Sequence, residues 1–90
     1  MLIALDYDHT YTLDPELWDN FIDMCAKNKH TVICATMRYD YEGKDVINTI
    51  GKKCKVYFTS RNAKKPFLEE MGIFPDVWID DNPMWLYKNG

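Results

Sequence analysis

Four short apolar runs that alternate with helix-like segments constrain the fold of this chain more than any other feature. The runs cover residues 2–7, 31–36, 55–60 and 77–80, and each has the length of a strand with polar or turn residues at its ends. Their apolar side chains are continuous rather than alternating, which is typical of strands covered on both faces. The pattern therefore predicts four buried strands.

Helical periodicity fills the three intervals between these strands. Asp14 followed by Pro15 is a helix start signal, and apolar residues recur at helical spacing from there to Asn28. Weaker helical segments cover about residues 42–50 and 63–71, and a last short helix begins near residue 85. This alternation predicts an α/β fold, a three-layer Rossmann-like open parallel sheet with right-handed crossovers.

Size and composition fit one small domain. The chain has 90 residues, of which 47% are apolar and 28% are charged, and its formal net charge is −3. Disorder would require lower hydrophobicity or a larger net charge, and a general nucleic-acid binder would carry a basic patch. We therefore treat residues 1–90 as a single domain that is not a general nucleic-acid binder.

Neither a membrane span nor a disulfide framework is indicated. No apolar run approaches the roughly 20 residues that a bilayer-spanning helix needs, and the first residues lack the basic segment of a signal peptide. The three cysteines, Cys25, Cys34 and Cys54, lie in apolar segments without CxxC spacing. They favour buried reduced thiols over disulfides or a zinc site. The expected location is the cytoplasm.

Polar side chains of complementary chemistry follow the predicted strands. Because ligands of open α/β sheets collect at the carboxyl ends of the strands, these side chains form the candidate site. In chain order they are Asp6, Asp8, Thr36, Arg38, Lys64, Lys65, Asp80 and Asp81.

Four acids gathered in one crevice need compensation. At an effective dielectric near 20 and a separation of about 5 Å, each like-charge pair costs roughly 3 kcal/mol, whereas a small domain is stable by only about 5–15 kcal/mol. Either the carboxylates are partly protonated or a cation neutralises them. Mg²⁺ is the natural candidate, since it is satisfied by a few carboxylates and keeps water and phosphate oxygens as its other ligands.

Such groups can hydrolyse a phosphate ester in two steps. A carboxylate beside Mg²⁺ can attack phosphorus and form an aspartyl phosphate. A second carboxylate two residues on can protonate the leaving alcohol and later deprotonate water. A threonine hydroxyl and a lysine ammonium can hold the phosphoryl oxygens as charge develops on them.

Four motifs in the same order resemble those of the haloacid dehalogenase superfamily, over residues 2–82. The string LIALDYDHTYT resembles its first motif, an apolar strand ending in DxDxT, and TVICAT resembles the second, an apolar strand ending in Thr. AKK before a helix is similar to the third motif, and VWIDD to the fourth, an apolar strand ending in paired acids. The resemblance implies a phosphatase-type core of about four strands in the order 3-2-1-4.

The resemblance also implies a role for most of the candidate residues. Asp6 corresponds to the nucleophile. Asp8 corresponds to the general acid/base, and it would also bind the metal through its backbone carbonyl. Thr36 would bind the phosphoryl group, as would Lys64 or Lys65; the start of the helix favours Lys64 without deciding the choice. Asp80 would bind Mg²⁺ directly, and Asp81 would lie close by or act through water. Arg38, outside the motifs, is ambiguous between a substrate-phosphate contact and a surface residue.

Two departures from the family pattern stand out. His9 occupies the position after Asp8 where the family often has Gly, so the imidazole can contact substrate. The chain also has no room for a cap domain. Small members without caps have an open crevice, and they tend to act on large substrates or with the help of a partner.

The expected function is therefore a Mg²⁺-dependent phosphomonoester hydrolase that acts on a phosphorylated small molecule or macromolecule. The alternative is an inactive module of the same fold that binds a metal or a phosphorylated ligand. A receiver domain would place its adjacent acid pair after the first strand, whereas here the pair comes last. A sheet this small, with two edge strands, can also pair with a copy of itself, so a homodimer is a further expectation.

Overall fold

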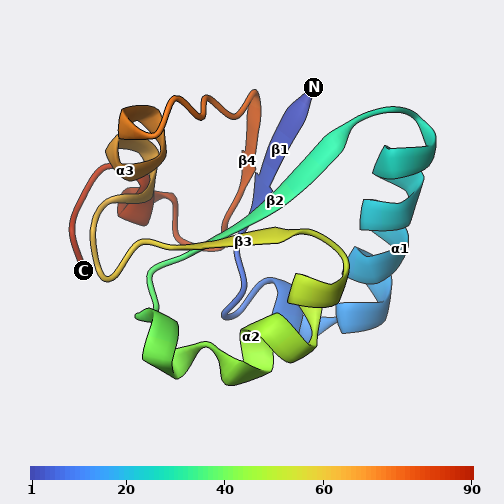
Figure 1. The fold of residues 1–90 in the computed structure, drawn as a ribbon, viewed down its shortest axis with the longest axis horizontal. Coiled ribbons are helices and arrows are strands. Elements are labelled where there is room, and N and C mark those ends of the chain that lie inside the picture. The colour runs from blue at the N-terminus through green and yellow to red at the C-terminus, as the bar shows by residue number, and fades with distance from the viewer.

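The four strands pair into one parallel sheet in the order β3-β2-β1-β4 (Figure 1). The computed structural model describes residues 1–90 and places β1 at Leu2–Leu5, β2 at Thr31–Thr36, β3 at Lys55–Phe58 and β4 at Val77–Ile79. Every neighbouring pair is parallel. The predicted α/β class, the number of strands and their order are confirmed.

Three α-helices connect the strands. They are α1 at Pro15–Lys27, α2 at Lys44–Asn48 and α3 at Lys64–Glu70, and short 3-10 turns precede or follow them. The Asp14 side chain accepts a hydrogen bond from the Leu17 N–H at 3.1 Å, which caps α1 as its start signal predicts. No further domain interrupts the connections after β1 and β3.

The second predicted helix, residues 42–50, is shorter than expected. It is divided into a 3-10 turn η2 at Asp40–Glu42, the helix α2 and a 3-10 turn η3 at Ile50–Lys52. Gly43 lies at the first junction, where a Cβ atom would be 2.3 Å from the ring of Phe58. A side chain at this position would require the ring of Phe58 to move, and the backbone leaves helical geometry at Gly43 and again at Thr49.

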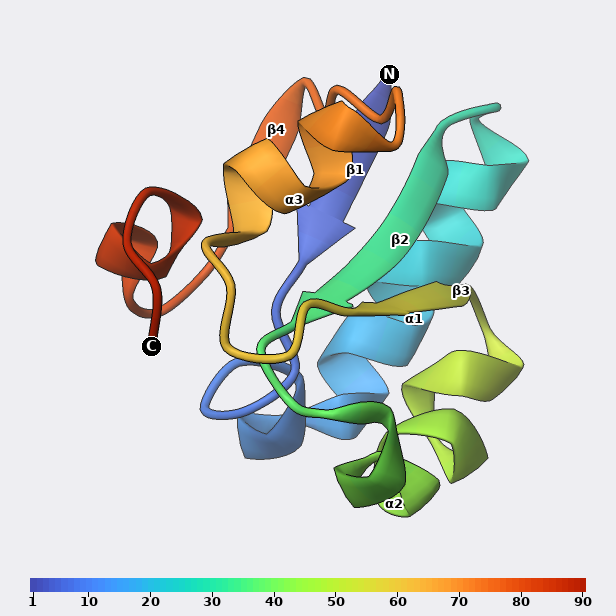
Figure 2. The ribbon, with the colours of Figure 1, turned by 60° about the vertical axis from the view of Figure 1, so that its left-hand side comes forward.

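The two faces of the sheet carry separate apolar clusters. Successive side chains of a strand point to opposite faces, so that Leu5 and Cys34 join α1 and α2 on one face. Ala4 and Ala35 pack with the fully buried Leu68 of α3 on the other face. Figure 2 shows this arrangement, with α3 in front of β1 and β4 and with α1 behind β2. The result is a three-layer domain.

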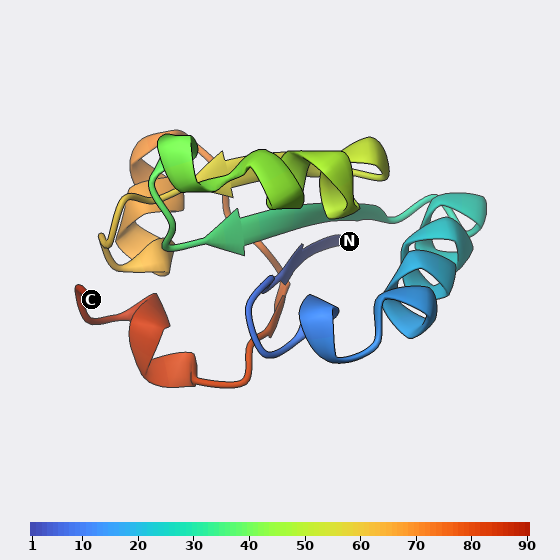
Figure 3. The ribbon, with the colours of Figure 1, turned by 90° about the horizontal axis from the view of Figure 1, so that it is seen from below.

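The carboxyl ends of the strands lie together at one end of the sheet. In Figure 3 the arrowhead of β2 points toward the side of the molecule that holds the C-terminus and the turn η4, Pro83–Leu86. Strands β1 and β4 end at Leu5 and Ile79, earlier than predicted. The first acids of the two acidic motifs therefore lie just beyond the sheet, on the connecting loops.

Two further sequence predictions concern cysteines and membrane spans. All three cysteines are free thiols, two of them buried. No helix combines the length and the apolar character needed to cross a bilayer.

Candidate active site

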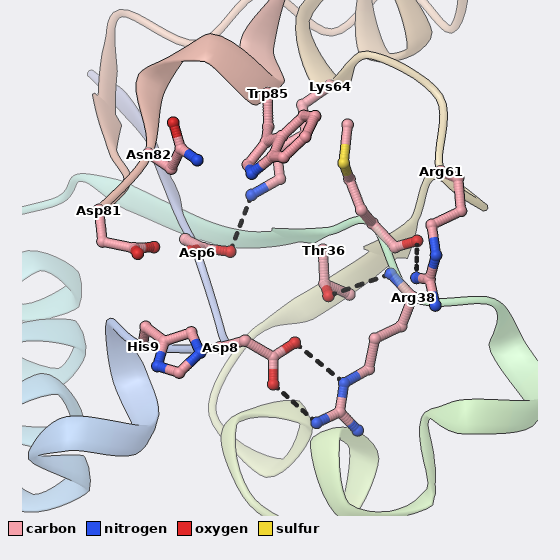
Figure 4. Close-up of a pocket in the computed structure, with 11 residues that line it drawn as sticks. Asp6, Asp8, His9, Thr36, Arg38, Arg61, Lys64, Asp81, Asn82 and Trp85 are labelled. Carbon is pink, nitrogen blue, oxygen red and sulfur yellow. Dashed lines mark hydrogen bonds and ion pairs between the residues drawn. The ribbon is translucent and has the colours of Figure 1, made fainter. Parts of the chain in front are cut away.

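A pocket of about 240 Å³ opens at the carboxyl ends of the strands (Figure 4). Six of the eight residues predicted for the site line it, together with five residues to which the sequence gave no motif role. The lining residues are Asp6, Asp8, His9, Thr36, Met37, Arg38, Arg61, Lys64, Asp81, Asn82 and Trp85. The two other predicted residues do not line the pocket: Asp80 contacts Lys64, and Lys65 pairs with Glu69 on α3.

Backbone strain is concentrated around this pocket. Four non-glycine residues have positive φ, and three of them, His9 (φ 60°), Ser60 (φ 53°) and Arg61 (φ 67°), follow β1 or β3 at its edge. Side chains disfavour this left-handed region, and such residues cluster where function constrains a loop. The strain at His9 also gives a physical reason for glycine at this position in the family that the sequence resembles.

Lys64 is the centre of a buried ion-pair cluster. Its Nζ lies 2.8 Å from Oδ1 of Asp6 and 2.6 Å from Oδ2 of Asp80. The three side chains are only 3%, 10% and 3% exposed, respectively. Helix α3 begins at Lys64, so the helix start fixes the position of the amine between the ends of β1 and β4.

Burial and charge oppose each other in this cluster. Desolvation raises the pKa of Asp6 to about 7, against the lowering effect of the Lys64 ammonium. Desolvation also disfavours the charged form of Lys64, but the carboxylates of Asp6 and Asp80 outweigh it and hold the lysine pKa above its ordinary value. Lys64 therefore stays charged, between the carboxyl groups of Asp6 and Asp80.

Carboxylate oxygens of Asp6, Asp80 and Asp81 form a group that could hold a metal ion. One oxygen from each lies within 4.8 Å of the others. Opposite ligands of an octahedral Mg²⁺ ion are about 4.2 Å apart, twice the metal–oxygen distance. The three carboxylates face one ammonium, and a divalent cation would offset the remaining negative charge. The residues present therefore fit Mg²⁺ in donor type, and oxygens up to 4.8 Å apart would have to approach one another by up to about 0.6 Å to bind it.

The two acids after β4 are placed differently within that group. Both oxygens of Asp80 have partners, since Oδ2 binds Lys64 and Oδ1 accepts the Asn82 N–H at 3.0 Å. Asp81 is exposed and lines the pocket, and its Oδ1 accepts only a long hydrogen bond of 3.4 Å from the Thr10 hydroxyl. This placement favours Asp81 as the direct ligand, the reverse of the order that the family resemblance implies.

Asp8 points away from the acid group, toward Arg38 (Figure 4). Arg38 Nη2 donates to Asp8 Oδ1 at 2.7 Å, and Nε donates to Oδ2 at 3.0 Å. These hydrogen bonds hold the pKa of Asp8 below its ordinary value, although desolvation opposes them. The carboxyl of Asp8 is therefore charged and held in place, and it is absent from the group of acids around the candidate metal site.

Arg38 has little capacity left for a phosphate. Besides its two bonds to Asp8, Nη1 donates to the Glu42 carbonyl at 2.8 Å and to Asp45 Oδ1 at 2.6 Å. Four of its five N–H groups are thus engaged. Arg38, in the loop after β2, thus links Asp8 to Asp45 of α2. One N–H group of its side chain is left for the predicted contact with a substrate phosphate.

Thr36 and the lysine pair complete the predicted set. Thr36 is 1% exposed, and its Oγ1 accepts a 3.4 Å bond from the Arg38 N–H, which leaves its hydroxyl hydrogen free for an anion in the pocket. Lys65 instead pairs with Glu69 at 2.6 Å on the outer face of α3, half exposed. Between the two lysines that the sequence left open, the structure brings Lys64 into the site.

Two residues that contribute to the site were given no role from the sequence. The Thr10 hydroxyl donates to Asp6 at 3.3 Å and lies between the first and last acidic motifs. Arg61 binds the Met37 carbonyl at 2.7 Å and Glu42 at 3.1 Å, and it fixes the loop after β2. The final Thr of the DxDxT motif could have indicated that Thr10 belongs to the site. The position of Arg61 depends on the conformation of its loop, which no short motif predicts.

No family model, no curated protein and no solved structure matches this chain.

Proposed function

We propose that this protein is a Mg²⁺-dependent phosphomonoester hydrolase that forms an aspartyl phosphate on Asp6. The observation that carries the proposal is the buried contact of the Asp6 carboxylate with the Lys64 ammonium, 2.8 Å apart, beside a group of three acids that could hold a metal ion. Carboxylate nucleophile, cation and metal-binding oxygens are the parts that phosphoryl transfer through a covalent intermediate needs.

Asp6 and Asp81 would hold the metal at the mouth of the pocket, and Asp80 would hold Lys64 from behind. When bound, Mg²⁺ would neutralise part of the charge on the phosphoryl oxygens and on the acids around them. It would also favour the ionised form of Asp6, whose pKa burial raises to about 7. Ionisation matters because only the carboxylate can attack phosphorus.

In the first step an oxygen of Asp6 attacks phosphorus and the bond from phosphorus to the ester oxygen breaks. Lys64 and the free hydroxyl hydrogen of Thr36 would hold the phosphoryl oxygens while negative charge grows on them. In the second step a water molecule attacks the same phosphorus atom, its proton passes to a base, and inorganic phosphate leaves Asp6 free again.

Asp8 would give the proton to the leaving alcohol and take the proton from water. Its present contact with Arg38 suits the second role, because a carboxylate with a lowered pKa is ready to accept a proton. For the first role the carboxyl has to turn from Arg38 toward the leaving group. Its side chain is 45% exposed, so rotation about its own bonds meets little packing.

We further propose that the protein is a cap-less member of the haloacid dehalogenase superfamily, as the four motifs suggest. The pocket of about 240 Å³ is smaller than the roughly 300–1,000 Å³ of pockets that enclose drug-sized ligands. It has room for the phosphoryl end of a substrate, and most of a larger substrate would lie outside.

The second candidate is a module that binds a phosphorylated ligand without hydrolysing it. The bidentate Arg38–Asp8 contact favours it, because in that position Asp8 supplies no proton to a leaving group.

Hydrolysis of 4-nitrophenyl phosphate, with Mg²⁺ and with EDTA, separates the two candidates. We expect turnover only with Mg²⁺, and loss of that turnover in Asp6→Asn. Asp40→Asn is the matched control, since the same chemical change lies at an exposed position outside the pocket. Equal rates for Asp6→Asn and the wild type would rule out the nucleophile, and binding of inorganic phosphate without turnover would favour the module.

A further inference from the structure

One wall of the pocket is apolar, although the rest of the lining is charged or polar. Met37, just after β2, and Trp85, in η4, are the two apolar residues among the eleven that line it. Both side chains are half-buried, so part of each surface faces the pocket. In Figure 4 the indole of Trp85 enters from the side opposite Asp8 and Arg38.

Met37 and Trp85 form this wall together. A Cβ atom on Gly90 would lie 3.0 Å from the Met37 sulfur and 3.7 Å from the indole ring, so both side chains contact the same short stretch of backbone. That stretch is anchored, since the Gly90 N–H donates to the Arg61 carbonyl at 2.8 Å. Asn89 accepts the Ala63 N–H at 2.8 Å as well. The backbone against which both side chains lie is therefore held in place.

The pocket has space beside the phosphoryl position. A water-sized atom needs about 10–15 Å³ of cavity volume, so four phosphate oxygens take about 40–60 Å³. More than half of the 240 Å³ cavity is then left. Asp6, Thr36 and Lys64 fix the phosphoryl group, so this remaining space receives the start of the leaving group.

The chemistry of the wall selects what that group can be. An indole face and a thioether both make favourable contacts with aromatic rings. A sugar or polyol without an aromatic ring would have to place hydroxyl groups against Met37, where they lose water without gaining a hydrogen-bond partner. A flat ring keeps its apolar faces against this wall and keeps its edge toward solvent.

We infer that the substrate is a phosphate monoester whose leaving group carries a flat aromatic ring, held against Trp85 and Met37. The inference rests on the proposed hydrolase function and names its substrate class. Aryl-alkyl phosphates and nucleoside monophosphates share this chemistry and differ in how far the ring lies from phosphorus. Trp85 is thereby a specificity-determining residue.

The test uses pairs of esters with matched alcohol leaving groups. Benzyl phosphate and cyclohexylmethyl phosphate place a flat or a puckered ring one carbon from the ester oxygen. Adenosine 5′-monophosphate and ribose 5-phosphate share the 5′ oxygen and differ in the base. We expect kcat/KM to favour the aromatic member of at least one pair by about tenfold, the usual contribution of one stacked ring. The pair that shows the preference tells whether the substrate is an aryl-alkyl phosphate or a nucleoside monophosphate.

Trp85→Ala should reduce that ratio to about one. Trp85→Phe keeps an aromatic face and should keep most of the preference. This second variant still tests the inference if Trp85→Ala does not fold. Tyr87→Ala is the control, because this exposed aromatic residue lies two positions further on and outside the pocket. It should leave the ratio unchanged.

Calorimetry with benzylphosphonate and cyclohexylmethylphosphonate, in Mg²⁺, separates this inference from the hydrolase proposal. Tighter binding of the aromatic phosphonate with no hydrolysis of any ester would support the aromatic ligand and refute the hydrolase. Hydrolysis of both members of each pair at equal rates would overturn the inference and leave the hydrolase standing. A ratio that survives in Trp85→Ala would also overturn it.

Discussion

Replacing Lys64 by methionine tests whether the buried cluster is organised as described. Methionine has a similar length and an apolar end, so the substitution removes the charge with little change in volume. The amine now lies 2.8 Å from Asp6 and 2.6 Å from Asp80, in side chains that are 3–10% exposed. Its removal leaves two buried carboxylates without a cation.

The size of the expected effect follows from this burial. Removing one partner of a buried ion pair typically costs about 3–5 kcal/mol, and 1 kcal/mol moves the melting temperature of a domain this size by about 4–8 °C. At pH 8 without divalent ions we therefore expect Lys64→Met to melt at least about 12 °C below wild type. The deficit should shrink at pH 5, because protons then neutralise the stranded carboxylates.

Lys65→Met is the matched control on the next residue. Lys65 pairs with Glu69 on the surface of α3, and exposed ion pairs of this kind contribute little. Thermal unfolding followed by circular dichroism should place Lys65→Met within error of wild type at both pH values. The description of the cluster is refuted if Lys64→Met melts within about 3 °C of wild type at pH 8, or if the two variants lose equal stability.

Four further predictions concern the pH dependence of stability, metal binding, the role of Asp8 and backbone strain. Because burial raises the pKa of Asp6 to about 7 from an unfolded value near 3.8, the native state binds the extra proton between these values. In EDTA, the unfolding free energy from urea titrations should therefore fall as pH rises from about 4 to 7, and Asp6→Asn should flatten this fall. Stabilisation by millimolar Mg²⁺ should be larger at pH 8 than at pH 5, since protons compete for the same carboxylate; equal melting shifts would count against the metal site. Arg38→Met should raise the pKa of Asp8, because the Arg38 hydrogen bonds hold it low. The basic limb of the pH profile of kcat/KM for an alkyl phosphate should then move to higher pH. If that limb does not move, Asp8 is not the general acid. His9→Gly should raise the unfolding free energy by up to about 1 kcal/mol by relieving the positive φ, and a loss of stability would show that the imidazole holds the loop.

The fold could be predicted from the sequence because its signals are local and agree with one another. Apolar runs such as residues 31–36 are strands in the structure with the predicted bounds, and the Asp14–Pro15 start signal marks the true start of α1. The second helix was predicted too long: the backbone leaves helical geometry at Gly43 and Thr49, and Gly43 lies against the ring of the distant Phe58. Periodicity alone carries no information on such contacts.

The candidate site could be predicted in outline for a topological reason. Parallel strands bring their carboxyl ends together, so residues after β1, β2 and β4 had to meet, and Asp6, Thr36 and Asp81 line one pocket. The choice between Lys64 and Lys65 depended on the first turn of α3, where the two side chains leave in different directions.

The orientation of individual side chains could not be predicted in the same way. Asp8 turns to Arg38 because α2 holds the guanidinium through Asp45, a contact set by tertiary packing. The motif alone would place Asp8 beside Asp6. The apolar wall of Met37 and Trp85 likewise depends on how residues 83–90 return to the pocket.

The most direct test of the account is to look for the covalent intermediate itself. In Asp8→Asn, 4-nitrophenol leaves without an acid, while hydrolysis of the intermediate loses its base. Acid-quenched protein, after reaction with 4-nitrophenyl phosphate and Mg²⁺, should therefore carry one phosphoryl group on the peptide that contains Asp6. The same peptide should stay unmodified when Asp6 is also replaced by Asn. Phosphate release that continues in the Asp6→Asn protein, or a phosphoryl group on any other residue, would contradict the account.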